Sequence, residues 1–404
     1  MVKLIGLGII NRFVFFPLGL LLFYILREIV YQQFFSKQND IKDKITVFAF
    51  LIIFPKVFSG IFYIISNIII KIYHIQKVNT LIINNERHDE IKEVLEKKKS
   101  FSYILVLLLL LLMSFIDVLG LLFLYLPRNN GERINTLFVN IDIIPRTSFI
   151  FVTCLLCNKI LKYTVKKHQI FSFILIGIGV LVYSTSMILW VIEQNTIHFN
   201  GYSVIASLFM GLGILFLVYG TIALIEVLEK YLMEIHYVNP YLIVFFEGLF
   251  DVILFLCYFA IFGNITEEFF QPLSYVMKNN PTGITLFVIV KLLFDLCRIQ
   301  TNYHFSPTLR FIVDMLHSFM ILFMINLMEK DILFLVLAFG GFFFSFSGSL
   351  IYNEFIVLYC FGLGFNTNKA IESRATMEPI QLTKAFEKES PILPDDSRNT
   401  INID

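Results

Sequence analysis

The sequence predicts an all-helical membrane protein that crosses the bilayer many times, and two observations support this fold class. Of the 404 residues, 57% are hydrophobic and only 16% are charged, whereas soluble proteins are about a quarter charged. Apolar runs of about 20 residues, the length that a helix needs to cross the hydrocarbon core, recur along the chain. We count ten such runs, near 4–26, 45–72, 101–126, 143–163, 169–191, 202–228, 241–262, 283–303, 307–328 and 331–352.

Two of the ten runs are less regular than the others. Arg12 and Pro17 interrupt the first run, and the fourth is short and polar at both ends, so nine spans is an alternative that the pattern leaves open. The first run lacks a small-x-small cleavage site and is too long for the apolar region of a signal peptide. We therefore expect it to be retained as a span.

The distribution of basic residues predicts the orientation of the chain. The loop 73–100 is rich in Lys and Glu and is expected to form a short solvated helix. Lys162, Lys166 and Lys167 lie in a loop that faces the same side as this one if the spans alternate. The positive-inside rule then places both loops and both termini in the cytoplasm. The polar tail 365–404 is expected to be disordered.

Composition excludes several functional classes. With 32 basic and 31 acidic residues, the chain has no net field that would attract nucleic acid. The five cysteines lie in apolar runs and are odd in number, which is typical of small buried hydrophobic residues rather than of a disulfide framework. The seven histidines form no iron-binding box, and no hydrolase, zinc-protease or nucleotide-binding motif is present. We therefore expect no enzyme, no metal site and no cofactor, and a metabolite carrier is the class that remains.

An internal repeat relates the fourth and fifth runs to the last two. In each unit a basic residue, Arg146 or His317, stands beside Ser or Thr at the start of an apolar helix. A short charged turn and a second apolar run follow, with Gly179 in one unit and Gly341 in the other at similar depth. Repeats with an odd number of spans enter the membrane from opposite sides, a design that recurs in secondary transporters. The alternative is a likeness of composition alone. The two five-helix repeats would cover 1–191 and 202–353.

Several ionisable residues lie inside the predicted spans. A charge at mid-bilayer costs about 2.5–3.5 kcal/mol on insertion scales, so such a residue normally faces a partner or a water-filled cavity. The mixed pairs among them can neutralise themselves, and stabilisation of a helix end is the alternative to a functional role. Asp117 stands alone in its run, and three pairs spaced four residues apart share a helix face: Glu247/Asp251, Lys291/Asp295 and Arg310/Asp314.

The pair Glu247/Asp251 is unusual because both members are acids. Two carboxylates on one helix face repel each other if both are ionised, and burial disfavours the charged form of each. We therefore expect at least one to be protonated or paired with a cation from another helix. The cations that the sequence offers for this are Lys291, Arg146 and Arg310.

Short motifs follow one another in a particular order along the chain. The second half carries E-K-Y at 229–231, N-P at 239–240 and E-G-L-F at 247–250. One further segment lies upstream, at 117–125, and two lie downstream, at 308–314 and 341–353. Together, in this order, the motifs and segments resemble the drug/metabolite transporter superfamily, and most closely the EamA-type solute carrier family 35, subfamily F. The matching positions outside the three motifs are Asp117, Gly120, Tyr125, Thr308, Arg310, Asp314, Gly341, Phe342, Gly348, Tyr352 and Asn353.

The resemblance extends over about residues 100–353 and implies a specific architecture and activity. It implies ten transmembrane helices as two inverted five-helix repeats, with both ends in the cytoplasm. It also implies movement of a small organic solute by alternating access. Relatives include nucleotide-sugar carriers of the Golgi and endoplasmic reticulum, and other carriers of endosomes, lysosomes or vacuoles. We therefore expect an endomembrane protein, with the plasma membrane as the other candidate.

Three departures from the family pattern affect the substrate. Asp251 stands where the family has glycine, His317 replaces an arginine, and the start of the fourth helix reads I-D-I-I-P-R with Arg146 at its end. Because that start borders the substrate cavity in relatives, the substrate class does not carry over. A scaffold or receptor that kept the fold without transporting is the alternative function.

These arguments define a hypothetical substrate-binding set. Its basic members would attract an anionic group, as in a nucleotide sugar, while a carboxylate would couple transport to protons or a counter-substrate. A homodimer is left open. The set comprises Asp117, Tyr125, Arg146, Glu247, Asp251, Lys291, Arg310, Asp314 and His317.

Overall fold

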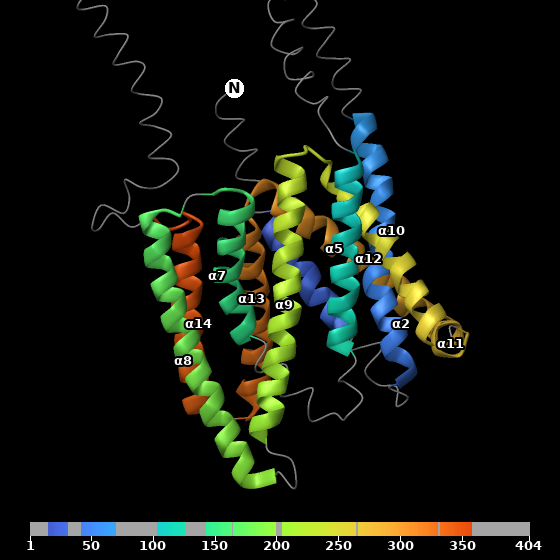
Figure 1. Cartoon of the computed structure of the whole chain (residues 1–404). Coiled ribbons are helices and arrows are strands. Elements are labelled where there is room, and N and C mark those ends of the chain that lie inside the picture. The colour runs from blue at the N-terminus through green and yellow to red at the C-terminus, as the bar shows by residue number, and fades with distance from the viewer. Residues whose placement is uncertain are drawn as a thin grey trace, which may run out of the picture.

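The computed structural model is helical throughout its described part, as expected (Figure 1). It describes residues 15–30, 42–69, 103–125, 143–163, 165–198, 204–263, 266–329 and 332–357. The predicted loop helix within 73–100 and the predicted disordered tail 365–404 lie outside these ranges.

The helices divide into long elements and a few short ones. Residues 15–30 and 59–69 are helical. The other elements are α2 (Lys42–Ile53), the 3-10 turn η1 (Phe54–Phe58), α5 (Tyr103–Tyr125), α7 (Ile143–Ile160), α8 (Lys167–His198), α9 (Val204–Glu234), α10 (Pro240–Phe262), the π-turn η3 (Thr266–Phe270), α11 (Gln271–Asn279), α12 (Pro281–His304), α13 (Pro307–Glu329) and α14 (Ile332–Tyr352).

Among the described residues, six helices are long and apolar enough to cross a membrane. By length and composition these helices are compatible with a multi-pass membrane protein, whereas ten crossings stay a prediction. The six are Val47–Ile69, Tyr103–Leu122, Lys167–Ser186, Leu212–Glu234, Pro240–Phe262 and Leu335–Tyr352.

Local sequence explains where α10 begins. The side chain of Asn239 accepts a hydrogen bond from the backbone N–H of Tyr241 at 2.9 Å, and Pro240 occupies the first helical position. Asn satisfies a free N–H at a helix start, and Pro has no N–H to leave unpaired there. The N-P part of the family-like motif is therefore a helix start signal.

The second apolar run is interrupted in its middle. Pro55 cannot donate a backbone hydrogen bond, and Phe54–Phe58 form a 3-10 turn between α2 and the helix 59–69. The hydroxyl of Ser59 donates to the carbonyl of Lys56 at 2.7 Å and lies 3.2 Å from the carbonyl of Tyr241. Polar groups at the interruption thus find partners inside the protein, as membrane burial requires.

The long helices pack as one bundle in which distant parts of the chain are neighbours (Figure 1). At one edge α8 packs along α14. The next helices are α7, α9 and α13, with α7 in contact with both others. On the other side α10 contacts α5, η1 and α12. The short helix α11 lies at the periphery of this side.

The contact between α8 and α14 is made through backbone. A Cβ atom on Gly341 would stand 2.8 Å from the carbonyl oxygen of Gly179 and 2.8 Å from the backbone nitrogen of Tyr183. A Cβ on Gly179 would meet the carbonyl of Gly341 at 2.6 Å. Small residues at such crossings let two membrane helices approach closely.

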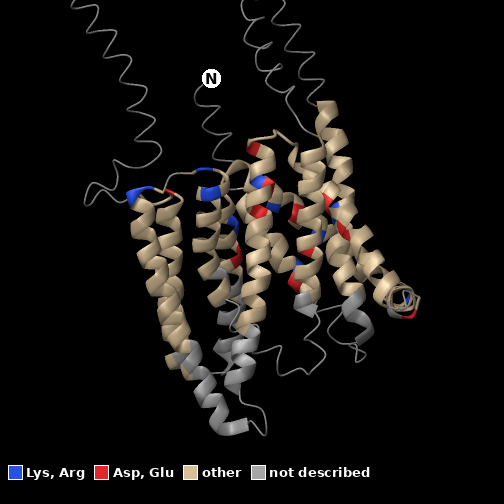
Figure 2. Ribbon diagram, viewed as in Figure 1, with Lys and Arg blue, Asp and Glu red and all other residues tan. Residues whose placement is uncertain are grey.

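The distribution of polarity is that of a protein in lipid. Large apolar side chains face outward, including Leu181, which is 69% exposed, and Ile261, which is 72% exposed. Charged residues instead cluster along α9, α10 and α12 (Figure 2), and several of their side chains, including those of Glu226, Glu247 and Arg298, are buried. Lipid solvates the apolar exterior, so polar groups are more stable when they face one another inside.

Candidate functional site

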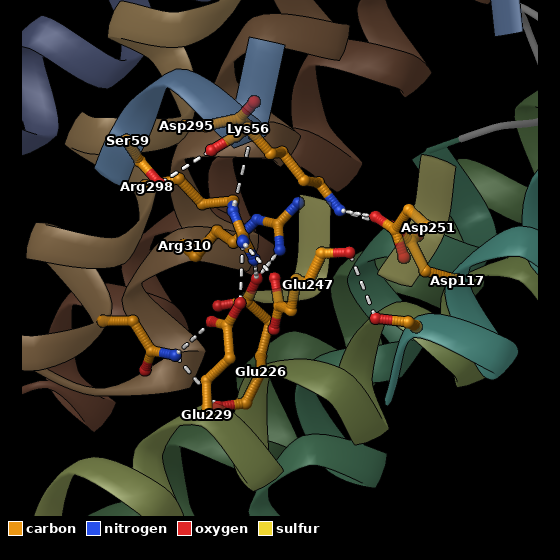
Figure 3. A network of polar contacts seen from close by, with 12 residues as sticks. Lys56, Ser59, Asp117, Glu226, Glu229, Glu247, Asp251, Asp295, Arg298 and Arg310 are labelled. Atoms are coloured by element: carbon orange, nitrogen blue, oxygen red, sulfur yellow. Dashed lines mark hydrogen bonds and ion pairs between the residues drawn. The ribbon is translucent and has the colours of Figure 1, made fainter. Parts of the chain in front are cut away.

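Two neighbouring groups of charged side chains lie inside the bundle, and together we call them the central network (Figure 3). Its side chains come from η1, α5, α9, α10, α12 and α13. Most are buried, with Asp117 and Arg310 partly exposed. Counted over the described residues, the network has seven carboxylates and four cations: Asp117, Glu226, Glu229, Glu247, Asp251, Asp295, Asp314, and Lys56, Lys291, Arg298, Arg310.

One part of the network is built around Lys56 of η1. Its Nζ lies 2.5 Å from Oδ2 of Asp117 on α5 and 2.8 Å from Oδ2 of Asp251 on α10. The Asp251 side chain is 0% exposed. An ammonium group carries three donors, so one lysine can satisfy both carboxylates. The turn that interrupts the second apolar run therefore carries a cation to two acids on other helices.

A second part is built around Arg298 of α12. Its Nη1 lies 2.6 Å from Oε1 of Glu226, and its Nη2 lies 2.6 Å from Oε1 of Glu229, both on α9. The same Nη2 is 3.4 Å from Oε2 of Glu247 on α10. The planar guanidinium has donors in a fixed fork that suits several carboxylates at once. Arg298 therefore ties together α9, α10 and α12.

The two mixed pairs predicted from spacing both form. Lys291 Nζ lies 2.5 Å from Oδ1 of Asp295, and Arg310 Nε lies 3.6 Å from Oδ2 of Asp314. Arg310 also forms an ion pair with Glu226, which connects α13 to the group around Arg298. A pair four residues apart in one helix needs no tertiary contact, which is why spacing alone predicts it.

Other motif residues hold helix ends in place around the network. Lys230 Nζ donates to the carbonyls of Asn302, Tyr303 and Phe305, each at 2.9 Å. These carbonyls lie in the last turn of α12 and just beyond it, where a helix leaves oxygens without intrahelical partners. The lysine of E-K-Y thus fixes the end of α12 against α9.

A similar contact joins α13 to α14. The hydroxyl of Ser306 donates to Oδ1 of Asn353 at 2.8 Å, and that of Thr308 donates to the same atom at 3.2 Å. Thr308 and Asn353 are both family-like positions from separate motifs. Their contact brings the start of α13 to the end of α14.

His317 is buried one turn beyond Asp314 on α13. Its ring centroid lies 3.6 Å from that of Tyr24 in the helix 15–30, and the guanidinium carbon of Arg27 lies 4.5 Å from the Tyr24 ring centroid. The predicted site residue His317 therefore packs against the first apolar run.

The structure brings most of the predicted substrate-binding set together. The backbones of Tyr125 and Arg146 belong to α5 and α7, while their side chains lie outside the described part of the structure. His317 packs beside Tyr24 as above. The predicted residues that meet in the central network are Asp117, Glu247, Asp251, Lys291, Arg310 and Asp314.

The expectation that Glu247 or Asp251 pairs with a cation from another helix is confirmed, but the cations are not the ones that the sequence suggested. Both acids contact cations from other helices, and these cations are Arg298 and Lys56. The expectation was wrong for Lys291 and Arg310, which pair with Asp295, Asp314 and Glu226 instead.

The predicted set left out five residues of the central network. Glu229 and Asp295 were noted only as members of a motif and a pair, and Lys56, Glu226 and Arg298 were not noted at all, although each leaves a signal. Lys56 is the only charged residue between positions 45 and 70. Arg298 belongs to a polar stripe at 291, 295, 298 and 302, the spacing of one helix face. Glu226 precedes Glu229 by three residues, which places both on one side of α9.

Comparison with known protein families finds no family that matches this chain, and a search of curated proteins finds no match either. The resemblance to drug/metabolite transporters therefore stays a proposal, which the geometry of the central network can support.

Proposed function

We propose that this chain is a secondary transporter of the drug/metabolite kind, which moves a small organic solute by alternating access. One observation carries the proposal: a cluster of charged side chains is buried among helices of membrane length and apolar composition. Ionisable groups inside a membrane are costly, and where they occur they mark paths for substrates, ions or protons.

The interruption at η1 supports the same function. Transporters form midplane sites with discontinuous helices whose unwound parts line the site. Phe54–Phe58 interrupt the apolar span Val47–Ile69 near its middle, and the lysine of this turn enters the central network. The broken helix and the charges therefore coincide in space.

Helix contacts support two inverted repeats of five spans. Numbered in chain order, the second and seventh runs meet through η1 and α10, the fourth and ninth through α7 and α13, and the fifth and tenth through α8 and α14. The contact of Gly179 and Gly341 is reciprocal, because each glycine faces the backbone of the other. Equivalent elements meet reciprocally near a two-fold axis. This arrangement supports ten crossings with the substrate site between the repeats.

The network also indicates how access could alternate. Lys56 is carried by the turn that interrupts its span, so a movement of this turn along α10 would separate Lys56 from Asp251. A solute or proton that replaces the lost partner would favour the opened state, because a ligand shifts an equilibrium only by binding one state better. Carboxylates outnumber cations among the described network residues, which favours protons or cationic groups over the anionic substrate expected from the sequence.

The test uses proteoliposomes exposed to a mixture of small metabolites, with and without a pH gradient. Mass spectrometry of the lumen should show that at least one solute accumulates with the wild-type protein and that the gradient changes its level. Glu247→Gln should reduce accumulation, because Glu247 connects α10 to Arg298. Glu267→Gln, at an exposed position of η3, is the matched control and should behave as wild type.

Two outcomes would contradict this proposal. If folded wild-type protein accumulates no solute, a scaffold or receptor becomes the better reading of the fold. If solute accumulates equally with Glu247→Gln and without a response to pH, the network has no role in coupling.

A further inference from the structure

We propose that the carboxylates of Asp117 and Asp251 form a binding site for an ammonium group, which Lys56 fills in this conformation, and that the transported solute is a primary amine that takes its place. The binding site itself follows from local geometry. The substrate class rests on the proposed transport function.

The contacts of Lys56 are those of a bound ammonium ion. Its Nζ lies between two carboxylates from different helices, at 2.5 Å from Asp117 and 2.8 Å from Asp251. Charge-assisted bonds between an ammonium and a carboxylate typically measure about 2.7–2.9 Å. Two acids share one cation here, so departure of the lysine would leave two facing carboxylates without it. Such a site is stabilised by a replacement cation or by protonation of one carboxylate.

A further buried acid adjoins this site. Glu247 lies one turn before Asp251 on α10, between the group around Arg298 and the group around Lys56 (Figure 3). Its side chain is 2% exposed, and its Oε1 has no hydrogen-bond partner among the described residues. The surroundings of the Asp117/Asp251 site therefore hold unused acceptor capacity for the donors of a ligand.

The two acids stand on helices that are linked to each other. The hydroxyl of Ser114 on α5 donates to the carbonyl of Glu247 on α10 at 3.2 Å, and the two helices pack against each other. Asp117 and Asp251 each lie within one turn of that contact. They therefore stay paired when other elements move.

The lysine, in contrast, is carried by the least regular part of its span. Lys56 belongs to the 3-10 turn between two helical segments, beside Pro55. This turn packs directly on α10, because a Cβ at Gly248 would stand 2.5 Å from Cβ of Lys56 and 2.8 Å from the backbone nitrogen of Val57. A shift of the turn along α10 would withdraw the ammonium while the acids remain in place.

The geometry favours a primary amine over other cations. A single nitrogen bridges two carboxylates from separate helices, which suits a compact –NH₃⁺ group with three donors. A guanidinium is a larger planar group whose donors are spread over three nitrogens, as in Arg298, whereas here one nitrogen contacts both carboxylates. A metal ion needs more oxygen ligands than the two that contact Lys56. The Lys56 side chain thus binds to the two carboxylates as a primary-amine ligand would, except that it is covalently attached to the chain.

The experiment removes the tethered amine and supplies a free one. Full-length Lys56→Ala in detergent should have a lower Tm than wild type, and propylammonium, which resembles the deleted part of the side chain, should raise that Tm with saturation. Tetramethylammonium, which has no N–H donors, and sodium at equal ionic strength should not. Lys56→Ala/Asp251→Asn should lose the response, and Lys278→Ala, at an exposed lysine, should show none.

Equal responses to sodium and propylammonium would overturn the choice of a primary amine. If propylammonium has no effect on Lys56→Ala, then Lys56 is only a structural counter-ion and the site is refuted. Should Lys56→Ala not yield folded protein, wild-type protein provides a second measurement. Hydrogen–deuterium exchange of the backbone amides in the turn η1 should increase with propylammonium and saturate as the lysine is displaced, and unchanged exchange would refute the site.

Transport of radiolabelled methylammonium into proteoliposomes then tests the substrate class separately. Saturable uptake that Asp251→Asn abolishes supports it. A Tm response of Lys56→Ala without any uptake by wild type would keep the ammonium site and overturn the substrate class. Thermal shifts need no transport, so failure of the proposed function is distinguishable from failure of the site.

Discussion

The central network and the α8/α14 edge hold their helices together in opposite ways. At the centre, ion pairs from six elements meet, and individual carboxylates share cations. At the edge, Gly179 and Gly341 bring two backbones into direct contact (Figure 1). Along most of its described length the α8/α14 pair carries no charge, whereas charges crowd the bundle centre (Figure 2).

This difference indicates which part of the molecule can switch. A carboxylate can exchange one cation or proton for another, so the centre can rearrange with small changes in distance. Close-packed backbone has no comparable alternative, because packed interiors resist continuous deformation. The central network is therefore suited to binding a ligand, and the α8/α14 contact is suited to holding the proposed repeats in a fixed position relative to each other.

The largest effect is expected at the centre, for Arg298→Met. This change removes the cation that Glu226, Glu229 and Glu247 share and leaves buried carboxylates with fewer partners. Breaking a buried pair from one side costs about 3–5 kcal/mol. We expect a loss of this size in the free energy of unfolding, measured by steric trapping in bicelles. Arg298→Lys should recover part of it, and a loss that is no larger for Met than for Lys would contradict the role of the charge.

The next largest effect is expected at the edge, for Gly341→Ala. The added Cβ would meet backbone atoms of Gly179 and Tyr183 at 2.8 Å, so α8 and α14 must move apart. Overpacking of this kind costs about 1–3 kcal/mol. Unlike defects at the centre, the loss should not vary with pH. Gly213→Ala is the matched control, since a Cβ there meets nothing within 4 Å. Equal Tm values for the two variants would exclude a tight crossing.

The smallest effect on stability is expected outside the central network and the Gly179/Gly341 contact, for Tyr163→Phe in the turn from α7 to α8. The hydroxyl of Tyr163 donates to Oε2 of Glu234 at 2.5 Å, and its side chain is partly exposed. One such bond contributes about 0.5–1.5 kcal/mol, and we expect the lower end.

The same bond predicts a pH dependence. Burial, and then the bond to Glu234, raise the pKa of Tyr163 above its ordinary value. A raised pKa in the folded state means that the stabilising bond is fully present below the unfolded pKa of about 10 and is lost as pH rises through the folded value. Wild type and Tyr163→Phe should therefore differ in Tm at neutral pH and converge in strong alkali. A constant difference would show that the hydroxyl is not ionising.

The sequence predicted local features of the site better than distant ones. The pairs Lys291/Asp295 and Arg310/Asp314 were predictable because both members lie on one helix face. The pair Lys56/Asp251 spans 195 positions in the chain, and no local spacing indicates it. The distinction between Glu247 and Asp251 rests on the resemblance alone and stays a prediction, and the partners of these two acids were not predicted.

By itself the sequence determined that the chain is helical, that several of its helices suit a membrane, and that charges lie inside them. Hydrophobic periodicity and run length are local properties of the sequence. Inside the bilayer the backbone must satisfy its own hydrogen bonds, so few backbone conformations other than the helix are possible. Only the tertiary structure decided which charges meet. Lys56 reaches Asp117 and Asp251 because a 3-10 turn interrupts its span against Gly248 of α10. Pairing between helices depends on their packing, which brings together residues that sequence distance keeps apart.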